Sequence, residues 1–457
     1  MPPRAPKVAL VSLGCPKNLI DSERMLALLA EGGCVVGAPA SRADVILINT
    51  CGFLASARRE SLEAITEAVG RKSRGKTRHG VPAATYCGGV PRVVVAGCLA
   101  TRDAEALYAA APGIDAIVGV NDRDEILYAV LGKGRITRLG RCQPASPGRN
   151  LPIASDAGRF RLTPRHTAYL RIAEGCSQQC TFCTIPAIRG PLRSKPPQMV
   201  LEEAAELIAD GAVELNIVGQ DTTSYGHDLG GRCDLAMLLR RLDSLSGLRW
   251  LRLMYAYPRR FSRRLIDAMA DCPRVVHYLD LPLQHVADPI LRRMGRGTSR
   301  RTIETLLASL RRRMGDVVIR TTFIVGFPGE GDKEFQELLS FVRDFRFAAL
   351  GAFEFSPEEG TPAARMPGQV PPDVKAARAE ELMLAQQEIA FQANRRMAGR
   401  ELEILVDGVD PTGRCVGRYY GQAPEVDSVC LLKRRRLAGR FHRLRVVGWD
   451  RYDLVVN

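Results

Sequence analysis

Residues 174–183 read Glu-Gly-Cys-Ser-Gln-Gln-Cys-Thr-Phe-Cys and place Cys176, Cys180 and Cys183 in a C-x3-C-x2-C spacing. The motif directly follows an apolar segment, residues 168–173, that is expected to form a buried strand. Three thiolates on one short loop can hold three irons of a 4Fe–4S cube and leave the fourth iron open. A zinc site normally takes four ligands in two pairs, and no fourth ligand follows locally. The spacing therefore favours an iron–sulfur site; the alternative is three buried cysteines without a metal.

An open iron suits S-adenosylmethionine, because the amino and carboxylate groups of that molecule can chelate it. An electron from the reduced cluster then breaks a sulfonium C–S bond and yields a 5′-deoxyadenosyl radical, which abstracts hydrogen from an unactivated carbon. Phe182, between the last two cysteines, is expected to shield the cluster from water, although a core aromatic would look the same. The motif thus predicts an enzyme that makes a carbon radical from S-adenosylmethionine.

Six strand–helix units begin at this motif. Helical patterns such as residues 197–210, 298–314 and 332–345 separate short apolar runs. This alternation predicts a partial (β/α)6 barrel, in which the chemistry lies at the carboxyl ends of the strands. The expected strands are residues 168–173, 213–218, 249–255, 276–281, 318–325 and 348–355.

Two turns of this barrel are candidate contacts for the cofactor. Gln220 and Asp221 follow the second strand, and Gly326 and Glu330 belong to a Gly-Phe-Pro-Gly-Glu turn after the fifth. Glycine lets the backbone approach an adenine or methionine group closely. Together with Phe182, these four residues are the predicted cofactor-binding residues, although either stretch is also compatible with a simple turn.

Three strand–helix units precede the barrel. Their strands are expected at residues 7–13, 44–49 and 92–96, and their helices at residues 19–30, 55–70 and 102–111. The strands are short runs of Val, Ile and Leu, typical of a sheet buried on both faces, so the pattern predicts a doubly wound parallel sheet. Residues 71–91, rich in Gly, Arg and Lys, are expected to form a surface insertion.

Cys15, Cys51 and Cys98 each stand just past the carboxyl end of one of these strands. In a parallel sheet the three ends share one edge, so the thiolates are expected to converge on a second cluster with three protein ligands. One cluster would make the radical, and the other would hold a sulfur for insertion. The alternative is three unrelated buried cysteines. We interpret the remaining cysteines as structural or incidental, with Cys87 a possible exposed thiol: Cys34, Cys87, Cys142, Cys233, Cys272, Cys415 and Cys430.

The last part of the chain changes pattern. An amphipathic helix over residues 373–396 leads to short alternating strands, which predict a small antiparallel β-barrel. These strands are expected at residues 402–406, 415–420, 428–432 and 443–447. We therefore divide the chain into an N-terminal domain, a polar linker, a radical core and a terminal barrel, at residues 1–141, 142–164, 165–393 and 394–457.

The bulk composition is that of a globular protein. The 457 residues carry a formal charge of +15, which favours contact with nucleic acid or a ribosome but is equally typical of a basic, GC-rich proteome. The basic tail residues 433–436 have the same two interpretations, RNA contact or a solvated face. No apolar run is long enough to span a membrane and no signal peptide precedes the first strand, so a cytoplasmic location is expected.

Across all three regions the chain resembles the methylthiotransferases of the radical S-adenosylmethionine superfamily, which end in a TRAM barrel. Residues 12–23, Ser-Leu-Gly-Cys-Pro-Lys-Asn-Leu-Ile-Asp-Ser-Glu, are similar to the RimO-type branch, which modifies an aspartate of ribosomal protein S-twelve. The tRNA-modifying branch more often has Gly-Cys-Gln-Met-Asn there. The longer connection at residues 71–91 departs from the family. Further stretches similar to the ribosomal branch are residues 49–53, 60–61, 225–228, 280–285, 356–361 and 423–427.

The resemblance implies a mechanism and partners. The radical takes hydrogen from the β-carbon of the target aspartate, sulfur comes from the cluster held by Cys15, Cys51 and Cys98, and a second S-adenosylmethionine adds the methyl group. A reductant protein such as flavodoxin or ferredoxin, ribosomal RNA contact through the TRAM domain, and no membrane are also implied. The alternatives are a tRNA adenosine methylthiotransferase and a non-catalytic iron–sulfur electron carrier or RNA-binding protein.

Overall fold

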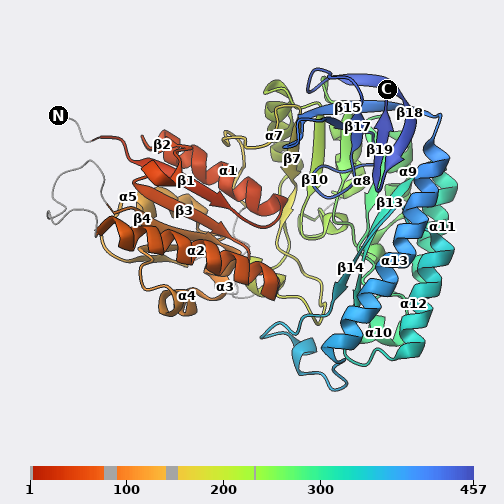
Figure 1. Cartoon of the computed structure of the whole chain (residues 1–457), viewed down its shortest axis with the longest axis horizontal. Helices are drawn as coiled ribbons and strands as arrows, with labels where there is room; N and C mark the ends of the chain where they lie inside the picture. The colour runs from red at the N-terminus through yellow and green to blue at the C-terminus, as the bar shows by residue number, and fades with distance from the viewer. Residues whose placement is uncertain (1–3, 77–89, 140–152, 231–232) are drawn as a thin grey trace. The chain divides into compact units, whose positions relative to one another are not determined.

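The computed structural model describes residues 4–76, 90–139, 153–230 and 233–457, so Cys87 and Cys142 lie outside it, as does most of the expected insertion (Figure 1). The chain forms two compact units. Unit 1 comprises Met1–Leu162, Glu174–Ser177 and Thr184–Arg193, and unit 2 comprises Thr163–Ala173, Gln178–Cys183 and Ser194–Asn457. Each is described separately below.

Unit 1 is built on a six-stranded sheet of order β2-β1-β3-β4-β5-β6, in which every pairing is parallel. The predicted parallel sheet is confirmed. Three short strands, β2, β5 and β6, were not predicted, because two to four residues leave little pattern to detect. The strands are β1 Lys7–Ser12, β2 Val35–Val36, β3 Val45–Thr50, β4 Arg92–Gly97, β5 Ala116–Gly119 and β6 Ile136–Arg138.

Helices cover both faces of this sheet. Alternate residues of a strand face opposite sides: Leu47 packs in the cluster with the helices α1 and α5, whereas Ile48 packs in the cluster with α2, α3 and α4. Burial on both faces explains why the strands are almost continuously apolar. The helix expected over residues 102–111 is found at residues 104–110, and a separate short helix over residues 98–102, which was not predicted, precedes it. The helices are α1 Pro16–Glu31, α2 Ala55–Lys76, α3 Cys98–Arg102, α4 Ala104–Ala110 and α5 Ile126–Leu131.

The described end of the expected linker is attached to unit 1. Asp156 forms a buried ion pair with Arg123 at 3.3 Å, and Arg159 forms one with Glu23 at 3.0 Å. Residues 153–162 therefore pack against α1 and the segment before α5 through charges that are shielded from water.

Unit 2 begins with a partial barrel whose six strands are ordered β14-β13-β12-β11-β10-β7, all parallel, as predicted. The strands are β7 Thr167–Arg171, β10 Glu214–Val218, β11 Trp250–Leu253, β12 Val275–Asp280, β13 Val318–Val325 and β14 Ala349–Glu354. Helices run between them on the outside: α7 Pro197–Ala209, α8 Leu235–Asp243, α9 Arg263–Asp271, α10 Asp288–Arg293, α11 Arg300–Arg313 and α12 Asp332–Phe345. This arrangement places the turns after β10 and β13 at the carboxyl ends of the strands.

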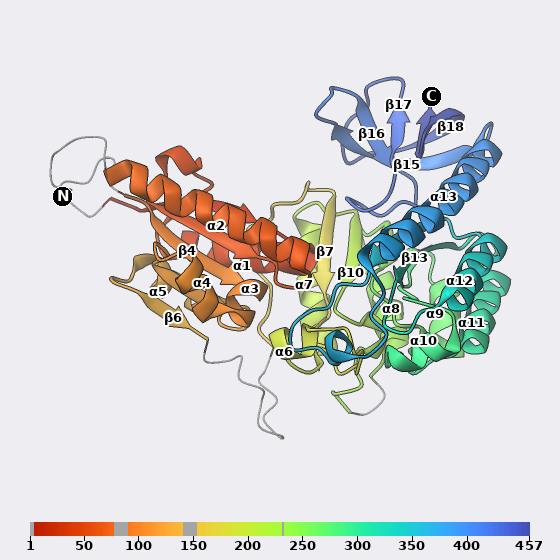
Figure 2. The same cartoon turned by 60° about the horizontal axis from the view of Figure 1, so that its bottom comes forward.

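The long helix α13, Pro372–Met397, leads to a closed five-stranded barrel, which confirms the expected terminal domain (Figure 2). Its order is β15-β16-β17-β19-β18, and the last strand was not predicted. The strands are β15 Glu401–Val409, β16 Cys415–Arg418, β17 Cys430–Leu432, β18 Phe441–Asp450 and β19 Asp453–Val456.

A network of buried charges joins this terminal barrel to the amino ends of the partial-barrel strands. Glu214, the first residue of β10, accepts hydrogen bonds from Arg252 at 3.0 Å and from Arg418 of β16 at 2.7 Å. Arg418 also pairs with Asp407 at 2.8 Å, and Asp407 lies 3.1 Å from His166. The terminal barrel therefore packs at the end of the strands opposite to their carboxyl ends.

The 423–427 loop of the terminal barrel takes part in the same contact. Glu425 accepts a hydrogen bond from Tyr169 of β7 at 3.2 Å, and Asp427 accepts one from Tyr278 of β12 at 2.7 Å. This stretch, which resembles the ribosomal branch of the family, thus also has a structural role, because it closes the amino end of the partial barrel with hydrogen bonds.

We expect Glu214→Gln to destabilise unit 2 by about 3–5 kcal/mol, because it removes the buried carboxylate that pairs with Arg252 and one of the two that pair with Arg418. Circular dichroism during urea unfolding measures the change. Glu403→Gln is the matched control, since Glu403 pairs with Arg249 at the surface and its loss is expected to cost less than about 1 kcal/mol. If the two variants were equally stable, the buried charges around Glu214 would not contribute to the stability of unit 2.

The destabilisation caused by Glu214→Gln should also depend on pH. Burial alone would raise the pKa of Glu214, but Arg418 and Arg252 lower it to about 2, from an ordinary value of 4.5. A carboxyl group with a lowered pKa stabilises the fold above its unfolded pKa and loses that effect as the pH falls towards the folded value. The difference between the native protein and Glu214→Gln is therefore expected to be constant above pH 4.5 and to shrink as the pH is lowered towards 2.

Candidate functional site

The three cysteines of unit 1 occupy equivalent positions on neighbouring strands. Cys15 is the N-cap of α1 three residues after β1 ends, Cys51 directly follows β3, and Cys98 directly follows β4 as the first residue of α3. Close approach of the loops requires Gly14, where a side chain would stand 3.0 Å from the Cβ of Cys51 in a backbone conformation with φ of +96°. The three thiols therefore lie at the carboxyl edge of the sheet, where the strand pattern predicts them.

Asn18 and Arg189 occupy the space beside these thiols. The Asn18 side chain donates to the carbonyl oxygen of Leu13, directly after β1, at 3.1 Å and to that of Thr50, the last residue of β3, at 2.8 Å. Arg189, the last residue of α6 (Ile185–Arg189), donates to the Sγ of Cys98 at 3.2 Å and to the Oδ1 of Asn18 at 2.6 Å. A fully buried guanidinium thus lies in hydrogen-bond contact with one of the predicted cluster ligands.

Two carboxylates hold Arg189 in this position. Its Nη1 donates to Glu174 at 2.9 Å and its Nη2 lies 3.1 Å from Asp21, and both acids are buried. Asp21 is in turn paired with Arg123 at 3.0 Å. The guanidinium is therefore fixed by opposite charges on two sides while it faces the thiol of Cys98 on a third.

The electrostatics of the three thiols differ. Burial alone would raise the pKa of Cys15, but the charges of Lys17 and Arg189 bring it below its ordinary value. Burial raises the pKa of Cys51 and raises that of Cys98 to about 12, with Arg189 opposing both shifts. A thiol that is buried in this way is deprotonated when it binds a metal, so metal binding and proton release are coupled at this edge.

The chemistry of these residues fits an iron–sulfur cluster, because three thiols follow neighbouring strands at one edge of the sheet and a buried guanidinium contacts one of them. A cube offers a different iron to each thiolate, so its three ligands lie further apart than those of one ion. The charge on three thiolates and a cluster also needs compensation, and the buried cation of Arg189 is placed to give it.

The second cysteine motif follows β7 and the short strand β8, Ala173–Glu174. Gly175 precedes its first cysteine at φ of +76°, and a side chain there would meet the carbonyl oxygen of Pro191 at 2.1 Å. The amide of Cys176 donates to the carbonyl of Gly190 at 3.1 Å. Glycine at position 175 is therefore needed for the tight turn that starts the motif.

Cys180 and Cys183 belong to unit 2 and have partners there. The amide of Cys183 donates to the carbonyl of Cys180 at 3.1 Å, and Arg296 places its Nη1 3.5 Å from the Sγ of Cys180. Phe182 packs edge-on against Phe327 of the turn after β13, with 6.3 Å between ring centroids. Each cysteine motif thus has one buried arginine that donates to a thiol.

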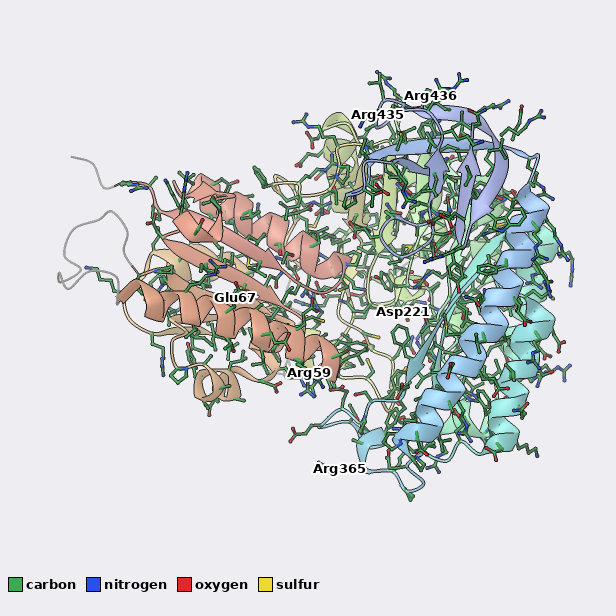
Figure 3. All side chains as sticks on the ribbon, viewed as in Figure 1. Arg59, Glu67, Asp221, Arg365, Arg435 and Arg436 are labelled. Carbon is green, nitrogen blue, oxygen red and sulfur yellow. The ribbon has the colours of Figure 1, made fainter. Side chains whose placement is uncertain are left out.

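Asp221 holds the cysteine loop in place. Its carboxylate accepts hydrogen bonds from Gln178 at 2.8 Å and from Thr223 at 2.6 Å, and it caps a short 3-10 turn at Ser224. Gln178 lies between the first two cysteines of the motif. The structure therefore gives Asp221 a positioning role, and direct contact of Gln220 or Asp221 with the cofactor stays a prediction (Figure 3).

Glu330 braces the glycine turn after β13. It accepts a hydrogen bond from the amide of Gly326 at 2.9 Å and one from Arg378 of α13 at 2.9 Å, and its other oxygen is 3.3 Å from His285. Gly326 has φ of +69°, and a side chain there would meet Lys375 at 2.3 Å. Cofactor contact by Gly326 and Glu330 also stays a prediction, made on a turn that packing keeps rigid.

Sequence reasoning missed the polar residues that surround the thiols, above all Asn18, Arg189 and Arg296. Each is an ordinary residue type outside the cysteine motifs, and one arginine among the 65 basic residues of this chain carries no signal. Their roles appear only when the fold brings distant segments together.

Three family models match successive parts of the chain. Residues 7–119 match the model of the uncharacterized protein family UPF0004, residues 170–342 that of the Radical SAM superfamily, and residues 398–457 that of the TRAM domain. A ribosomal protein uS12 methylthiotransferase RimO from Anaeromyxobacter sp. (strain Fw109-5) is 43% identical over 452 residues, which cover 98% of this chain and 92% of that protein. The chain belongs to the RimO family of methylthiotransferases.

Other RimO proteins are equally similar. The RimO of Pelotomaculum thermopropionicum is 43% identical over 457 residues and 98% of both chains. Among solved structures, the radical S-adenosylmethionine methyltransferase TsrM from Kitasatospora setae has a TM-score of 0.54 at 15% identity over 79% of this chain and 77% of that one, a likeness of fold. Membership in the superfamily brings an iron–sulfur cluster and S-adenosylmethionine as cofactors. No helix within the described residues is long and apolar enough to cross a membrane.

Proposed function

We propose that this protein adds a methylthio group to the β-carbon of an aspartate in ribosomal protein uS12, using two 4Fe–4S clusters and S-adenosylmethionine. Membership in the RimO family supports the reaction, since relatives that match 98% of the chain are named ribosomal protein uS12 methylthiotransferases. The observation that carries the proposal is the set of three thiols, Cys15, Cys51 and Cys98, at one edge of the unit 1 sheet with Arg189 in contact.

The two sets of cysteines have separate tasks. Cys176, Cys180 and Cys183 would hold the cluster that S-adenosylmethionine chelates, and Cys15, Cys51 and Cys98 would hold the other. When bound, these groups supply a carbon radical, the inserted sulfur and the methyl group. Phe182, packed on Phe327, excludes water beside the first set, and the pairing of Asp221 with Gln178 keeps its loop in one conformation.

The remaining proposals concern the cofactor, the domains and the partners. Phe182, Gln220, Asp221, Gly326 and Glu330 would contact S-adenosylmethionine, because they lie on the turns at the carboxyl ends of the partial barrel. We propose domains at residues 1–141, 165–393 and 394–457, with a linker at residues 142–164. A flavodoxin or ferredoxin would supply electrons.

The TRAM barrel is a candidate contact for ribosomal RNA. Residues 433–436, Lys-Arg-Arg-Arg, form an exposed loop after β17, and Figure 3 shows Arg435 and Arg436 projecting away from the barrel. Neutral replacements in this loop are expected to weaken RNA binding and its salt dependence.

Mass spectrometry of the substrate tests the proposed reaction. Small ribosomal subunits and tRNA are isolated from cells with and without this enzyme, and peptides of uS12 are compared with tRNA nucleosides. A methylthio group on the uS12 aspartate that depends on the enzyme is the expected result. A methylthio group found only on tRNA adenosine would identify the tRNA branch instead. If the reduced, reconstituted protein released no 5′-deoxyadenosine from S-adenosylmethionine, a non-catalytic role would remain.

A further inference from the structure

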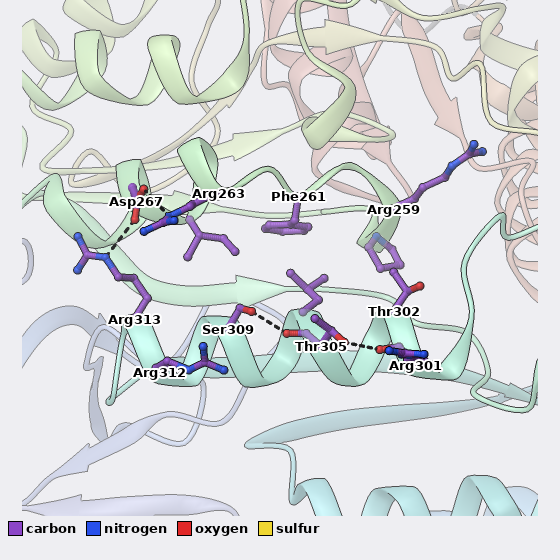
Figure 4. Close-up of a pocket in the computed structure, with 13 residues that line it drawn as sticks. Arg259, Phe261, Arg263, Asp267, Arg301, Thr302, Thr305, Ser309, Arg312 and Arg313 are labelled. Atoms are coloured by element: carbon purple, nitrogen blue, oxygen red, sulfur yellow. Dashed lines mark hydrogen bonds and ion pairs between the residues drawn. The ribbon is translucent and has the colours of Figure 1, made fainter.

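A groove of about 750 Å³ runs along the outside of unit 2 between the helices α9 and α11 (Figure 4). We call it the α9–α11 groove. Leu306 and Ile266 contribute apolar surface to it, and Phe261 lies opposite α11. Nothing in the proposed radical chemistry uses this groove, because it lies on the helical exterior of the partial barrel.

Arginines dominate the charge of the groove. Five line it, namely Arg259, Arg263, Arg301, Arg312 and Arg313, against one carboxylate, Asp267. Asp267 is shared between Arg263, at 4.0 Å, and Arg313, at 3.1 Å. Within the described part of the chain, no carboxylate lies at ion-pair distance from the other three arginines. The groove therefore presents uncompensated positive charge, which favours an anionic partner.

The α11 wall is a regular stripe. Arg301, Thr305, Ser309 and Arg312 follow one another at intervals of four, four and three residues, so they share one face of the helix. At 1.5 Å per residue the two arginines are about 16 Å apart along the axis, a length that covers several phosphates of a nucleic-acid strand. Guanidinium groups bind phosphate oxygens in bidentate fashion, so this spacing suits an extended polyanion.

The hydroxyl groups of the stripe distinguish RNA from other polyanions. Thr305 donates its hydroxyl hydrogen to the carbonyl of Arg301 at 2.8 Å, and Ser309 donates to the carbonyl of Thr305 at 2.8 Å. Each hydroxyl therefore offers lone pairs to the groove, and these accept hydrogen bonds. A ribose 2′-hydroxyl can donate such a bond, whereas a phosphate, a DNA sugar or a carboxylate cannot. Phe261 adds an aromatic surface on which a base can stack.

A second, smaller groove connects this surface with the carboxyl ends of the barrel strands. It has a volume of about 390 Å³, shares Arg259 and Phe261 with the first groove, and reaches Thr223. Thr223 donates to Asp221, the residue that ties down the cysteine loop, at 2.6 Å. A strand bound along both grooves would run from the outer helices to the turn after β10.

We propose that the α9–α11 groove binds the sugar–phosphate backbone of a segment of small-subunit ribosomal RNA. The groove then holds the enzyme on the RNA that surrounds its protein substrate, independently of the TRAM domain. The choice of ribosomal RNA over other RNA rests on the proposed function, whereas the preference for RNA rests on the arginines and the hydroxyl acceptors.

Fluorescence anisotropy with a labelled fragment of small-subunit ribosomal RNA tests this, using the full chain without turnover. The double variant Arg301→Gln with Arg312→Gln is expected to bind the RNA about tenfold more weakly. The plot of the logarithm of the association constant against the logarithm of the salt concentration should become shallower, its slope losing about two in magnitude. The matched control replaces Arg343 and Arg396, which are exposed on α12 and α13, by glutamine and is expected to bind within about twofold of the native protein.

Two further measurements make the outcome decisive. Arg301→Lys with Arg312→Lys keeps the charge and should restore the salt slope, which separates charge loss from misfolding. Thr305→Val should lower affinity for the RNA about threefold without changing affinity for DNA of the same sequence.

Binding by the glutamine variant equal to that of the control overturns the proposal. Preferential competition by bulk tRNA overturns the ribosomal source, and displacement of the RNA by polyglutamate at equal charge overturns recognition of RNA. Because no turnover is measured, none of these results depends on the proposed reaction.

Discussion

Replacing Cys15, Cys51 and Cys98 together by alanine will lower the iron content of anaerobically reconstituted protein from about eight to about four per chain. The variant will form no methylthio product, yet it will still release 5′-deoxyadenosine, because the cysteine motif at residues 176–183 is intact. The physical reason is the position of the three thiols on adjacent strands of one sheet edge, where one cluster takes all three. Iron analysis together with mass spectrometry of a uS12 peptide measures the effect.

The matching variant replaces Cys176, Cys180 and Cys183 by alanine. It should also retain about four irons, but it should release no 5′-deoxyadenosine, since the cluster that chelates S-adenosylmethionine is the one removed. Cys34→Ala is the control, because Cys34 is buried in an apolar cluster between sheet and helix and should leave both iron content and product unchanged. About four irons in the native protein, unaffected by loss of the three unit 1 cysteines, would contradict the sulfur-insertion account.

Replacing Arg189 by glutamine will lower the reduction potential of the cluster held by Cys15, Cys51 and Cys98 by roughly 50–100 mV. The guanidinium is fully buried and donates to the Sγ of Cys98 at 3.2 Å. A cation in that position stabilises the more negative, reduced form of the cluster, and about 59 mV corresponds to a tenfold change for one electron. Arg189→Lys keeps the charge but not the forked geometry of the guanidinium. The reduction potential of the cluster in this variant should therefore lie between those of the native protein and of Arg189→Gln.

The reduction potential of one cluster can be measured cleanly only when the other cluster is absent. Potentials are therefore determined by an EPR-monitored redox titration in a background with Cys180 and Cys183 replaced by alanine. Arg193→Gln serves as the control, because Arg193 lies in the same segment and donates to Asn121 at 2.8 Å. A potential that is the same in Arg189→Gln and Arg193→Gln would show that the contact with Cys98 does not tune the cluster.

Loss of Arg189 should also affect folding of unit 1. Glu174 and Asp21 would keep their buried charges without this partner, an arrangement that typically costs about 3–5 kcal/mol. Asp21 retains its ion pair with Arg123, which should moderate the cost at that carboxylate. The redox titration distinguishes the two effects, because it reports on molecules that have folded and assembled a cluster.

Local pattern made much of the fold predictable. The six strands of the partial barrel and three of the unit 1 strands are short apolar runs between turns, and their predicted bounds differ from the observed ones by two residues at most. The strand over residues 318–325 and the helix over residues 332–345 are found with the predicted bounds. The missed strands β2, β5 and β6 are too short to carry a pattern and exist because neighbouring strands offer them partners.

The candidate site was predictable to a lesser extent. The positions of Cys15, Cys51 and Cys98 could be inferred because each follows a strand, and parallel strands end at one edge. The polar partners could not be inferred: the sequence assigned Asp221 to the cofactor, but it did not predict the hydrogen bonds from Gln178 and Thr223 to that carboxylate. A hydrogen-bond partner depends on which distant segments meet, and spacing along the chain does not contain that information.

The sequence by itself determined which thiols exist, how they are spaced, and at which edge of each sheet they lie, because strand direction and side-chain period are local properties of the chain. The tertiary structure alone decided which charge stands beside them. Arg189 and Cys98 are separated by 91 residues, and their contact exists because the segment after the second cysteine motif folds against the edge of the unit 1 sheet. Burial there makes the contact strong, since little water remains to screen a charge that two carboxylates hold in place.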